Sequence, residues 1–269
     1  MSALVVLVVI GALTGLTTVL FGFGGGFVTV PVIIWADAAA GPAAATVAVA
    51  TSSLVMVASA VGATTATPRP VLRRLRGTAP LLVLLGVGGL CGAVAAGLAP
   101  APLVHWGFVV YLAITVADVL ARPGFLRPHS AARAAAGQRA FAIPAPLGMP
   151  IGALASFLGV GGSVMTVPLL RRSGLPMGTA AALANPLTAC VSAPACLVFL
   201  TTTHGADTRA LVLAVGSVDL GAAALLLLGA LPVIMLLRRR PPRIPDHLHA
   251  GGYVALLCSV LTAMLLRTP

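Results

Sequence analysis

Residues 21–31 read FGFGGGFVTVP, and residues 158–168, which lie 137 positions later, read LGVGGSVMTVP. Six of the eleven positions are identical, among them three glycines and the closing Thr-Val-Pro. An alanine-rich apolar stretch follows each copy, from Pro42 and from Pro176. A repeat over this distance indicates an internal duplication. We therefore predict a first half at residues 1–121, a linker at 122–140 and a second half at 141–269.

Composition places both halves in a membrane. The chain has 269 residues, of which 59% are hydrophobic and 8% charged, whereas soluble domains carry about 25% charged residues. A helix that crosses a bilayer needs about 20 mostly apolar residues. Six stretches meet this criterion: residues 42–67, 77–98, 103–121, 176–203, 209–237 and 251–266. Together with two glycine-broken regions, at 2–37 and 141–170, they predict an all-α polytopic membrane protein of about 8–10 transmembrane segments.

The charged residues indicate orientation. The chain carries 16 basic residues, all of them arginine, against 5 acidic ones, for a net charge of +11. Fourteen arginines fall in four groups between the apolar stretches, at residues 69–76, 122–139, 171–172 and 238–243. Such grouping fits cytoplasmic loops under the positive-inside rule, and it lacks the exposed basic and aromatic face of a nucleic-acid binder. The expected surroundings are a lipid bilayer, and no nucleic acid is expected as a partner.

The path of the broken regions follows from the same arginines. If each region crossed the membrane once, the two sides would share the arginines 10 to 6. If each region enters and returns, as a re-entrant hairpin or as two crossings, the division becomes 14 to 2. The second path leaves three further crossings in each half, so the halves enter from opposite faces. Inverted repeats with broken helices at matching positions are typical of secondary transporters, whose binding site lies near the midplane.

The breaks also predict the site. Backbone at membrane depth must be paired or line a polar cavity, and each break starts a new helix whose free N–H groups and positive dipole end favour an anion. We predict that substrate is bound by Gly22, Gly24, Gly25, Gly26, Thr29, Thr51, Ser52 and Ser53 in the first half and by Gly159, Gly161, Gly162, Ser163, Thr166 and Asn185, supported by Thr188, in the second. Thr51 and Asn185 are equivalent, each nine residues after its proline. For any single hydroxyl, the alternative is a bond back to a helix carbonyl.

A few further residues carry expectations of their own. Asp219 falls near the middle of the stretch 209–237, where a carboxylate is costly and therefore a functional candidate; we predict proton coupling there, with a structural carboxyl beside Ser217 as the alternative. Asp118 and Arg122 have the spacing of a helical ion pair. Asp246 is interpreted as a loop residue. Gly88 and Gly92 predict close helix packing within the chain, with a homodimer contact as the alternative.

The sequence lacks the motifs of the enzyme classes that its glycines and cysteines could suggest. A dinucleotide loop would need glycine where Phe27 and Val164 stand, and a P-loop needs the lysine that the chain lacks. The four cysteines have neither CxxC spacing nor neighbouring histidines. The sequence shows no nucleophile with a base. We therefore predict a protein that is not an enzyme and uses no cofactor and no metal.

These features resemble the TauE/SafE sulfite exporter family, also called the toluene sulfonate uptake permeases, whose halves each carry a glycine-rich segment followed by a proline, here residues 22–31 and 159–168. The resemblance covers nearly the whole chain. It implies a multi-pass transporter of the bacterial inner membrane that moves sulfite or a sulfonate-type organosulfur anion. Asn185-Pro186 stands where the first half has Thr51-Ser52, which implies an asymmetric site.

The expected function is export of such an anion by alternating access, with proton coupling as a further expectation. Two alternatives remain open from the residues. One is import of thiosulfate or another small, even neutral, sulfur solute, and the other is an anion channel.

Overall fold

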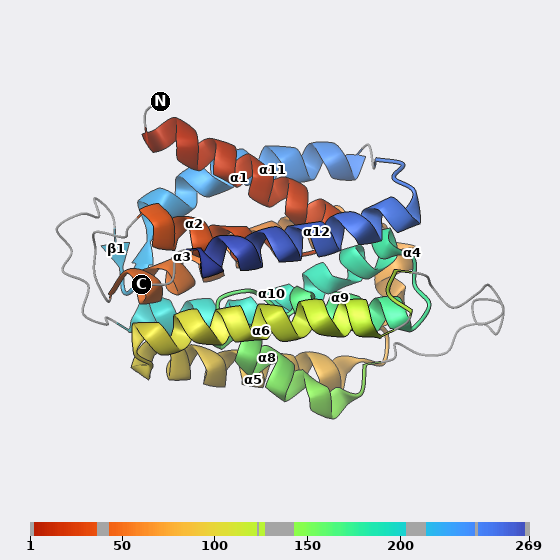
Figure 1. Ribbon diagram of the computed structural model, residues 1–269, viewed down its shortest axis with the longest axis horizontal. Coiled ribbons are helices and arrows are strands. Elements are labelled where there is room, and N and C mark those ends of the chain that lie inside the picture. Colours follow the sequence, from red (N-terminus) through yellow and green to blue (C-terminus); the bar gives the residue numbers. More distant parts are fainter. Residues whose placement is uncertain are drawn as a thin grey trace.

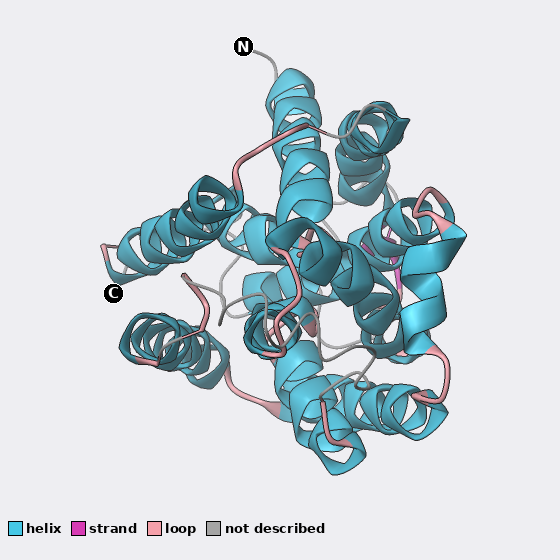
Figure 2. Cartoon of the chain, turned by 90° about the vertical axis from the view of Figure 1, so that its right-hand side faces the viewer, coloured by secondary structure: helices cyan, strands magenta, loops and turns pink. Residues whose placement is uncertain are grey.

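The computed structural model describes residues 3–36, 43–122, 124–126, 143–202, 214–239 and 242–266. In this part of the chain nearly all regular structure is helical, and the sheet is limited to one antiparallel pair, β1 (Ala214–Val215) and β2 (Val218–Asp219). The helices run along the longest axis of the molecule (Figure 1), so that a view along this axis shows most of them nearly end-on (Figure 2). The predicted all-α polytopic fold is confirmed.

Seven of the described helices are long and apolar enough to cross a membrane. They are α1 (Ala3–Phe21), α3 (Ala43–Thr65), α5 (Ala79–Leu98), α6 (Ala101–Ala121), α10 (Met177–Thr201), α11 (Leu220–Arg239) and α12 (Asp246–Leu265). A short helix α4 (Arg69–Leu72) and a 3₁₀ turn η1 (Arg73–Leu75) lie between α3 and α5. The chain is therefore a multi-pass membrane protein.

The two broken regions account for the difference from the predicted 8–10 segments. The first consists of full-length α1 followed by α2 (Gly26–Ala36), and the second of η2 (Ala145–Leu147), α8 (Gly148–Phe157) and α9 (Ser163–Arg172). At a rise of about 1.5 Å per residue, a ten-residue helix spans only about half of a hydrocarbon core of roughly 30 Å. The second region is thus a pair of half-length helices.

Large apolar side chains cover the outside of the bundle. Val83, Ile114 and Leu228 are each 64% exposed, and they belong to three different long helices, α5, α6 and α11. In water, surfaces of this kind would drive aggregation. In a bilayer these side chains face acyl chains, and their exposure there carries no free-energy penalty. The association of the helices with one another is then driven mainly by close packing.

Close packing is most evident between α1 and α11. A Cβ atom added to Gly11 would lie 2.1 Å from the carbonyl oxygen of Leu226, and one added to Gly15 would lie 2.5 Å from that of Ala230. Only glycine allows the two backbones to approach this closely. The first helix of the predicted first half is therefore packed against a helix of the predicted second half.

The reciprocal contact joins α8 and α5. Gly148 and Gly152 stand 137 positions after Gly11 and Gly15, and Cβ atoms there would lie 2.9 Å and 2.3 Å from the carbonyl oxygens of Leu81 and Leu85. Gly88 and Gly92 approach α8 in the same way, as the sequence predicted for packing within the chain; Cβ atoms there would lie 2.1 Å from the carbonyl oxygens of Met149 and Ala153.

The arginine-bearing segments gather at one end of the molecule. In Figure 1, α4 and the C-terminal ends of α6, α9 and α11 all lie toward the same, right-hand end. The predicted helical ion pair is confirmed at 3.1 Å between Arg122 and Asp118, and Arg172 contacts the same carboxylate at 2.6 Å. The predicted linker at 122–140 lies mostly outside the described residues.

Two helix starts differ from the prediction. The predicted span 209–237 begins in the structure at Leu220, because a turn at Gly216, whose φ is +61°, forms the β1–β2 hairpin before it. Asp219 is therefore not in the middle of a span: it caps α11 and accepts a 3.0 Å hydrogen bond from the N–H of Ala222. Asp246 is likewise not a loop residue. It is the first residue of α12 and directly follows Pro245, the residue that precedes the helix.

Candidate functional site

The glycines at the two breaks adopt backbone conformations that other residues avoid. In the first break φ is +76° at Gly22, +62° at Gly24 and +102° at Gly25, and in the second it is +67° at Gly159 and +69° at Gly161. Left-handed backbone costs an ordinary L-residue about 1–2 kcal/mol. The glycines therefore end one helix and allow the chain to turn into the next. Gly162 is different, because it has helical backbone and directly precedes α9.

The two breaks meet in the buried interior. A Cβ at Gly26 would lie 2.6 Å from the carbonyl oxygen of Gly159, and one at Gly161 would lie 3.6 Å from that of Phe23. Ser52 on α3 joins them, since its hydroxyl donates to the carbonyl of Gly159 at 3.3 Å. Every residue from 21 to 27 and from 158 to 164 is buried. Two segments predicted from a repeat in sequence are thus in contact in space.

The half-length helices lead away from this meeting point in opposite directions. In Figure 1, α9 runs toward the arginine-bearing end and α2 lies toward the other end. The first N–H groups of a helix have no partner within it, and each helix start carries about half a positive elementary charge. Both starts therefore face the buried centre.

Several predicted side chains bond to their own helix. Thr29 donates to the carbonyl of Gly25 at 2.8 Å and Ser53 to that of Ala50 at 2.6 Å. Ser52 also donates to the carbonyl of Val49 at 2.8 Å. These three hydroxyls therefore form the hydrogen bonds to helix carbonyls that the sequence analysis gave as the alternative to substrate binding. Thr51 instead reaches across to β2, directly before α11, and accepts a hydrogen bond from the N–H of Asp219 at 3.0 Å.

Six other buried polar atoms near the breaks have no protein hydrogen-bond partner among the described residues. They are Thr14 Oγ1, Ser59 Oγ, Ser163 Oγ, Thr166 Oγ1, Asn185 Oδ1 and Thr188 Oγ1, all on residues with no more than 1% exposure. Most buried polar atoms in proteins are paired, and leaving one unpaired costs about 1–3 kcal/mol. These six atoms are therefore buried polar groups whose hydrogen-bonding capacity the described protein leaves unused.

Three of these side chains lie against the first break. A Cβ at Gly25 would lie 2.6 Å from Cγ2 of Thr14 and 3.8 Å from Oγ of Ser59. Cγ2 of Thr188 would lie 2.6 Å from a Cβ at Gly24 and 2.9 Å from one at Gly161. Thr188 therefore contacts both breaks. Thr14 and Ser59 were not predicted from sequence, because neither has a counterpart in the other half.

An aromatic group closes the site on the side of α12. The ring of Tyr253 stacks on Phe23 with centroids 5.1 Å apart, and Phe23 stacks on Phe27 at 4.5 Å. All three side chains are fully buried. They hold the first break against α12 and keep its surroundings apolar, which strengthens any electrostatic interaction made there.

Charge at the site comes from backbone and not from arginine. Arg171 is the one arginine with a fully buried side chain among the described residues. It sits near the far end of α9, where it pairs with Asp246 and donates to the carbonyls of Phe125 at 3.0 Å and Leu175 at 3.2 Å. Asp246 also accepts from the N–H of Met177 at 2.8 Å. Arg171 is thus fully engaged in joining α9, α10 and α12.

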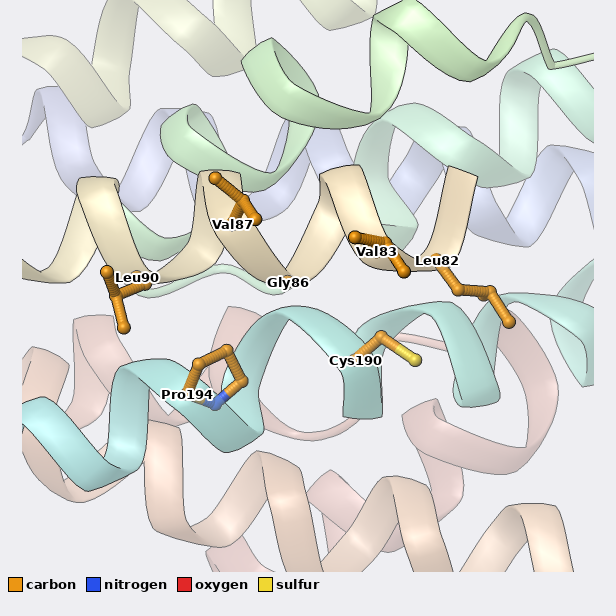
Figure 3. Close-up of a pocket in the computed structure, with 7 residues that line it drawn as sticks. All are labelled: Leu82, Val83, Gly86, Val87, Leu90, Cys190 and Pro194. Carbon is orange, nitrogen blue, oxygen red and sulfur yellow. The ribbon is translucent and has the colours of Figure 1, made fainter. Parts of the chain in front are cut away.

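A hollow on the molecule lies elsewhere, between α5 and α10 (Figure 3). It is lined by Leu82, Val83, Gly86, Val87, Leu90, Cys190 and Pro194. This lining is apolar and offers none of the strong donors that hold an anion. The hollow therefore does not coincide with the predicted site.

Comparison with known proteins agrees with this architecture. The model of the family described as Sulfite exporter TauE/SafE matches residues 7–265, almost the whole chain. No curated protein and no solved structure matches the chain. The matched region includes both breaks, six of the seven long helices and most of α1. The chain therefore belongs to the TauE/SafE sulfite exporter family, a family of membrane transporters for sulfite and related sulfur anions.

Proposed function

We propose that this protein exports sulfite or a small sulfonate-type anion across the bacterial inner membrane, and that it binds this anion where the two glycine breaks meet. The observation that carries the proposal is the convergence of two helix starts on a buried centre, near which several hydroxyls, among them that of Thr188, are unpaired within the described protein. Membership of a sulfur-anion transporter family supports the substrate class. Backbone N–H groups and hydroxyls are sufficient to hold a small oxyanion without a buried arginine.

Alternating access between two inverted halves is the mechanism that we propose. Three features support it: the reciprocal glycine packing of α1 on α11 and α8 on α5, the opposed directions of α2 and α9, and the arginines at one end. Because the breaks are buried, a solute reaches them only when helices move apart. Opening toward one end and then the other would expose the same site to each side in turn. By the positive-inside rule, the arginine-bearing end faces the cytoplasm.

Uptake into proteoliposomes tests the proposal. The purified protein should give saturable flux of sulfite, thiosulfate or sulfoacetate above that of protein-free vesicles. Counter-transport should accelerate this flux, as a carrier requires and a channel does not. Flux that never saturates would favour the channel, and saturable flux of an unrelated solute alone would reject the sulfur assignment.

A matched pair of variants tests the position of the site. Thr188→Val removes an unpaired hydroxyl while keeping the shape, and it should raise the half-saturation concentration about tenfold or more, because a hydrogen bond to a charged group contributes about 1.5–3 kcal/mol. Thr115→Val on α6 is the control, since its buried hydroxyl already donates to the carbonyl of Tyr111 at 2.8 Å. Equal effects of the two changes would place the substrate elsewhere.

A further inference from the structure

The arginine segment, residues 69–76, joins α3 to α5, and we infer that it binds the headgroup of an anionic phospholipid at the arginine-bearing end of the molecule. The segment reads RPVLRRLR and comprises α4, η1 and Arg76. Half of its residues are thus arginine. This contact with the bilayer is independent of the solute that the protein transports.

The arginine segment turns apolar side chains to the protein and charge to the outside. The side chains of Val71 and Leu75 pack against the hydrophobic core of the bundle, and Leu72 is half-buried. All four arginines of the segment are exposed: Arg69, Arg73, Arg74 and Arg76. The apolar side chains therefore hold the segment against the bundle and leave its guanidinium groups accessible to a molecule outside the protein.

The neighbouring helices keep the segment at the level of the lipid headgroups. It begins four residues after α3 ends at Thr65 and ends three residues before α5 begins at Ala79, and both helices are long and apolar enough to cross the membrane. Thr67, just before the segment, donates to the carbonyl of Ala63 in α3 at 2.7 Å, which ties the segment to this helix. The headgroup layers lie directly outside a hydrocarbon core of about 30 Å. Charges at the ends of two spanning helices therefore lie in such a layer.

No carboxylate of the described protein neutralises these arginines. Asp118 and Asp246 lie at the same end of the molecule, but each already pairs with arginine outside the segment. Asp219 belongs to the β1–β2 hairpin, and β1 lies at the opposite end in Figure 1. The two remaining acidic residues, Asp37 and Asp207, are outside the described residues. Within the described part of the chain, the four positive charges of the segment therefore have no ion-pair partner.

An anionic phospholipid supplies the missing negative charge. The guanidinium group is planar and can hold two oxygens of a phosphate with parallel hydrogen bonds. Clusters of about four to eight basic residues beside a membrane-crossing helix bind anionic headgroups, and each such residue strengthens the attraction about fivefold. A zwitterionic lipid also has a phosphate but no net charge, so it should bind more weakly. A soluble anion lacks the acyl chains that keep a lipid beside the segment.

The experiment measures lipid binding to the purified full-length chain in detergent by native mass spectrometry, at one salt concentration because salt screens exposed charges. Dioleoylphosphatidylglycerol is the anionic probe, and dioleoylphosphatidylcholine, which has the same acyl chains, is the zwitterionic control. We expect the anionic lipid to bind at least about tenfold more tightly. Inorganic phosphate at the concentration of the lipid should not displace it. Equal affinity for the two lipids, or displacement by phosphate, would overturn the inference.

Matched variants test whether the lipid lies at the segment. Arg74→Gln should weaken binding of phosphatidylglycerol about fivefold, and Arg73→Gln combined with Arg74→Gln about 25-fold. Arg73→Lys combined with Arg74→Lys keeps the charge and should retain most of the preference for the anionic lipid. Arg122→Gln is the control at the same end, because this exposed guanidinium already pairs with Asp118 at 3.1 Å, and it should change the affinity by no more than about twofold. Equal losses for Arg74→Gln and Arg122→Gln would overturn the assignment to the segment.

Discussion

The phenolic hydroxyl of Tyr253 donates a 3.0 Å hydrogen bond to the carbonyl oxygen of Val164. Pro168 lies four residues after Val164 in α9. Because proline has no N–H, that carbonyl receives no bond from its own helix. The tyrosine of α12 therefore supplies the donor that the proline of the repeated motif removes. Since its ring also stacks on Phe23, one side chain fixes both breaks.

Loss of this hydroxyl should destabilise the fold. Tyr253→Phe leaves the Val164 carbonyl buried without a partner, so we expect the free energy of unfolding to fall by about 1–2 kcal/mol, measured by thermal unfolding in detergent. Tyr111→Phe is the control, because the buried hydroxyl of Tyr111 has no partner among the described residues. A Tyr253 variant as stable as the Tyr111 variant would remove the structural role of this bond.

Backbone conformation at the second break should distinguish two adjacent glycines. Gly161→Ala places a side chain on left-handed backbone, 2.9 Å from Cγ2 of Thr188 and 3.0 Å from Sδ of Met56, and should cost at least about 1–2 kcal/mol of unfolding free energy. Gly162→Ala meets only ordinary contacts at 3.5 Å and beyond on helical backbone, so it should retain wild-type stability. Equal melting temperatures for the two variants would contradict the described geometry.

The contact between α1 and α11 should tolerate no added atom. Gly11→Ala would bring a methyl group to 2.1 Å from a backbone oxygen, which forces the helices apart, and overpacking of this kind costs about 1–3 kcal/mol. Gly152→Ala should act equally on α8 and α5. Gly178→Ala on α10 is the matched control, since nothing lies within 4 Å of its Cβ position. Similar unfolding curves for all three variants would count against the reciprocal packing.

The ion pair between the fully buried Arg171 and Asp246, whose side chain is 40% exposed, should matter more than the two pairs of Asp118. Asp246→Asn removes the charge that compensates a fully buried guanidinium, and breaking such a pair costs about 3 kcal/mol. Asp118→Asn removes the partner of Arg122, whose side chain is 73% exposed, and of Arg172, which is 20% exposed. We expect about 1 kcal/mol or less there. Denaturation of both variants would give the two losses of unfolding free energy. A larger loss for Asp118→Asn would contradict the greater importance of the Arg171 pair.

Proton coupling by Asp219 remains a prediction, now from a different position. The carboxylate caps α11 next to Thr51, at the end of the span instead of its middle. Asparagine also caps helices well, so Asp219→Asn should preserve stability and remove only proton movement. Methanesulfonate is the substrate to use, because it brings no proton of its own. Unchanged proton flux with this substrate would leave Asp219 a structural cap.

The general architecture could be predicted from the sequence because hydropathy, charge and repetition can be read directly from the residues. The apolar stretches predicted α3, α5, α6 and α10 to within a few residues, and the repeated motif located both breaks. The prediction from hydropathy was wrong at the start of α11. Hydropathy alone extends this apolar stretch across Asp219, whereas Gly216 and the β1–β2 hairpin interrupt it. The prediction also left out Thr14 and Ser59, whose significance depends on facing Gly25 from two other helices.

The sequence by itself determined that this chain is an all-helical membrane protein with a repeated glycine motif, and that its conformational irregularities lie at the two copies of this motif. Only the tertiary structure decided which polar groups serve those motifs. Thr29 and Ser53 satisfy their own helices, while Thr188 and Asn185 retain unused hydrogen-bonding capacity within the described part of the chain. The physical reason is that a hydroxyl in a helix has a carbonyl of the preceding turn within reach, and the packing of neighbouring elements decides whether it bonds to that carbonyl or, like Thr51, to a group on another element.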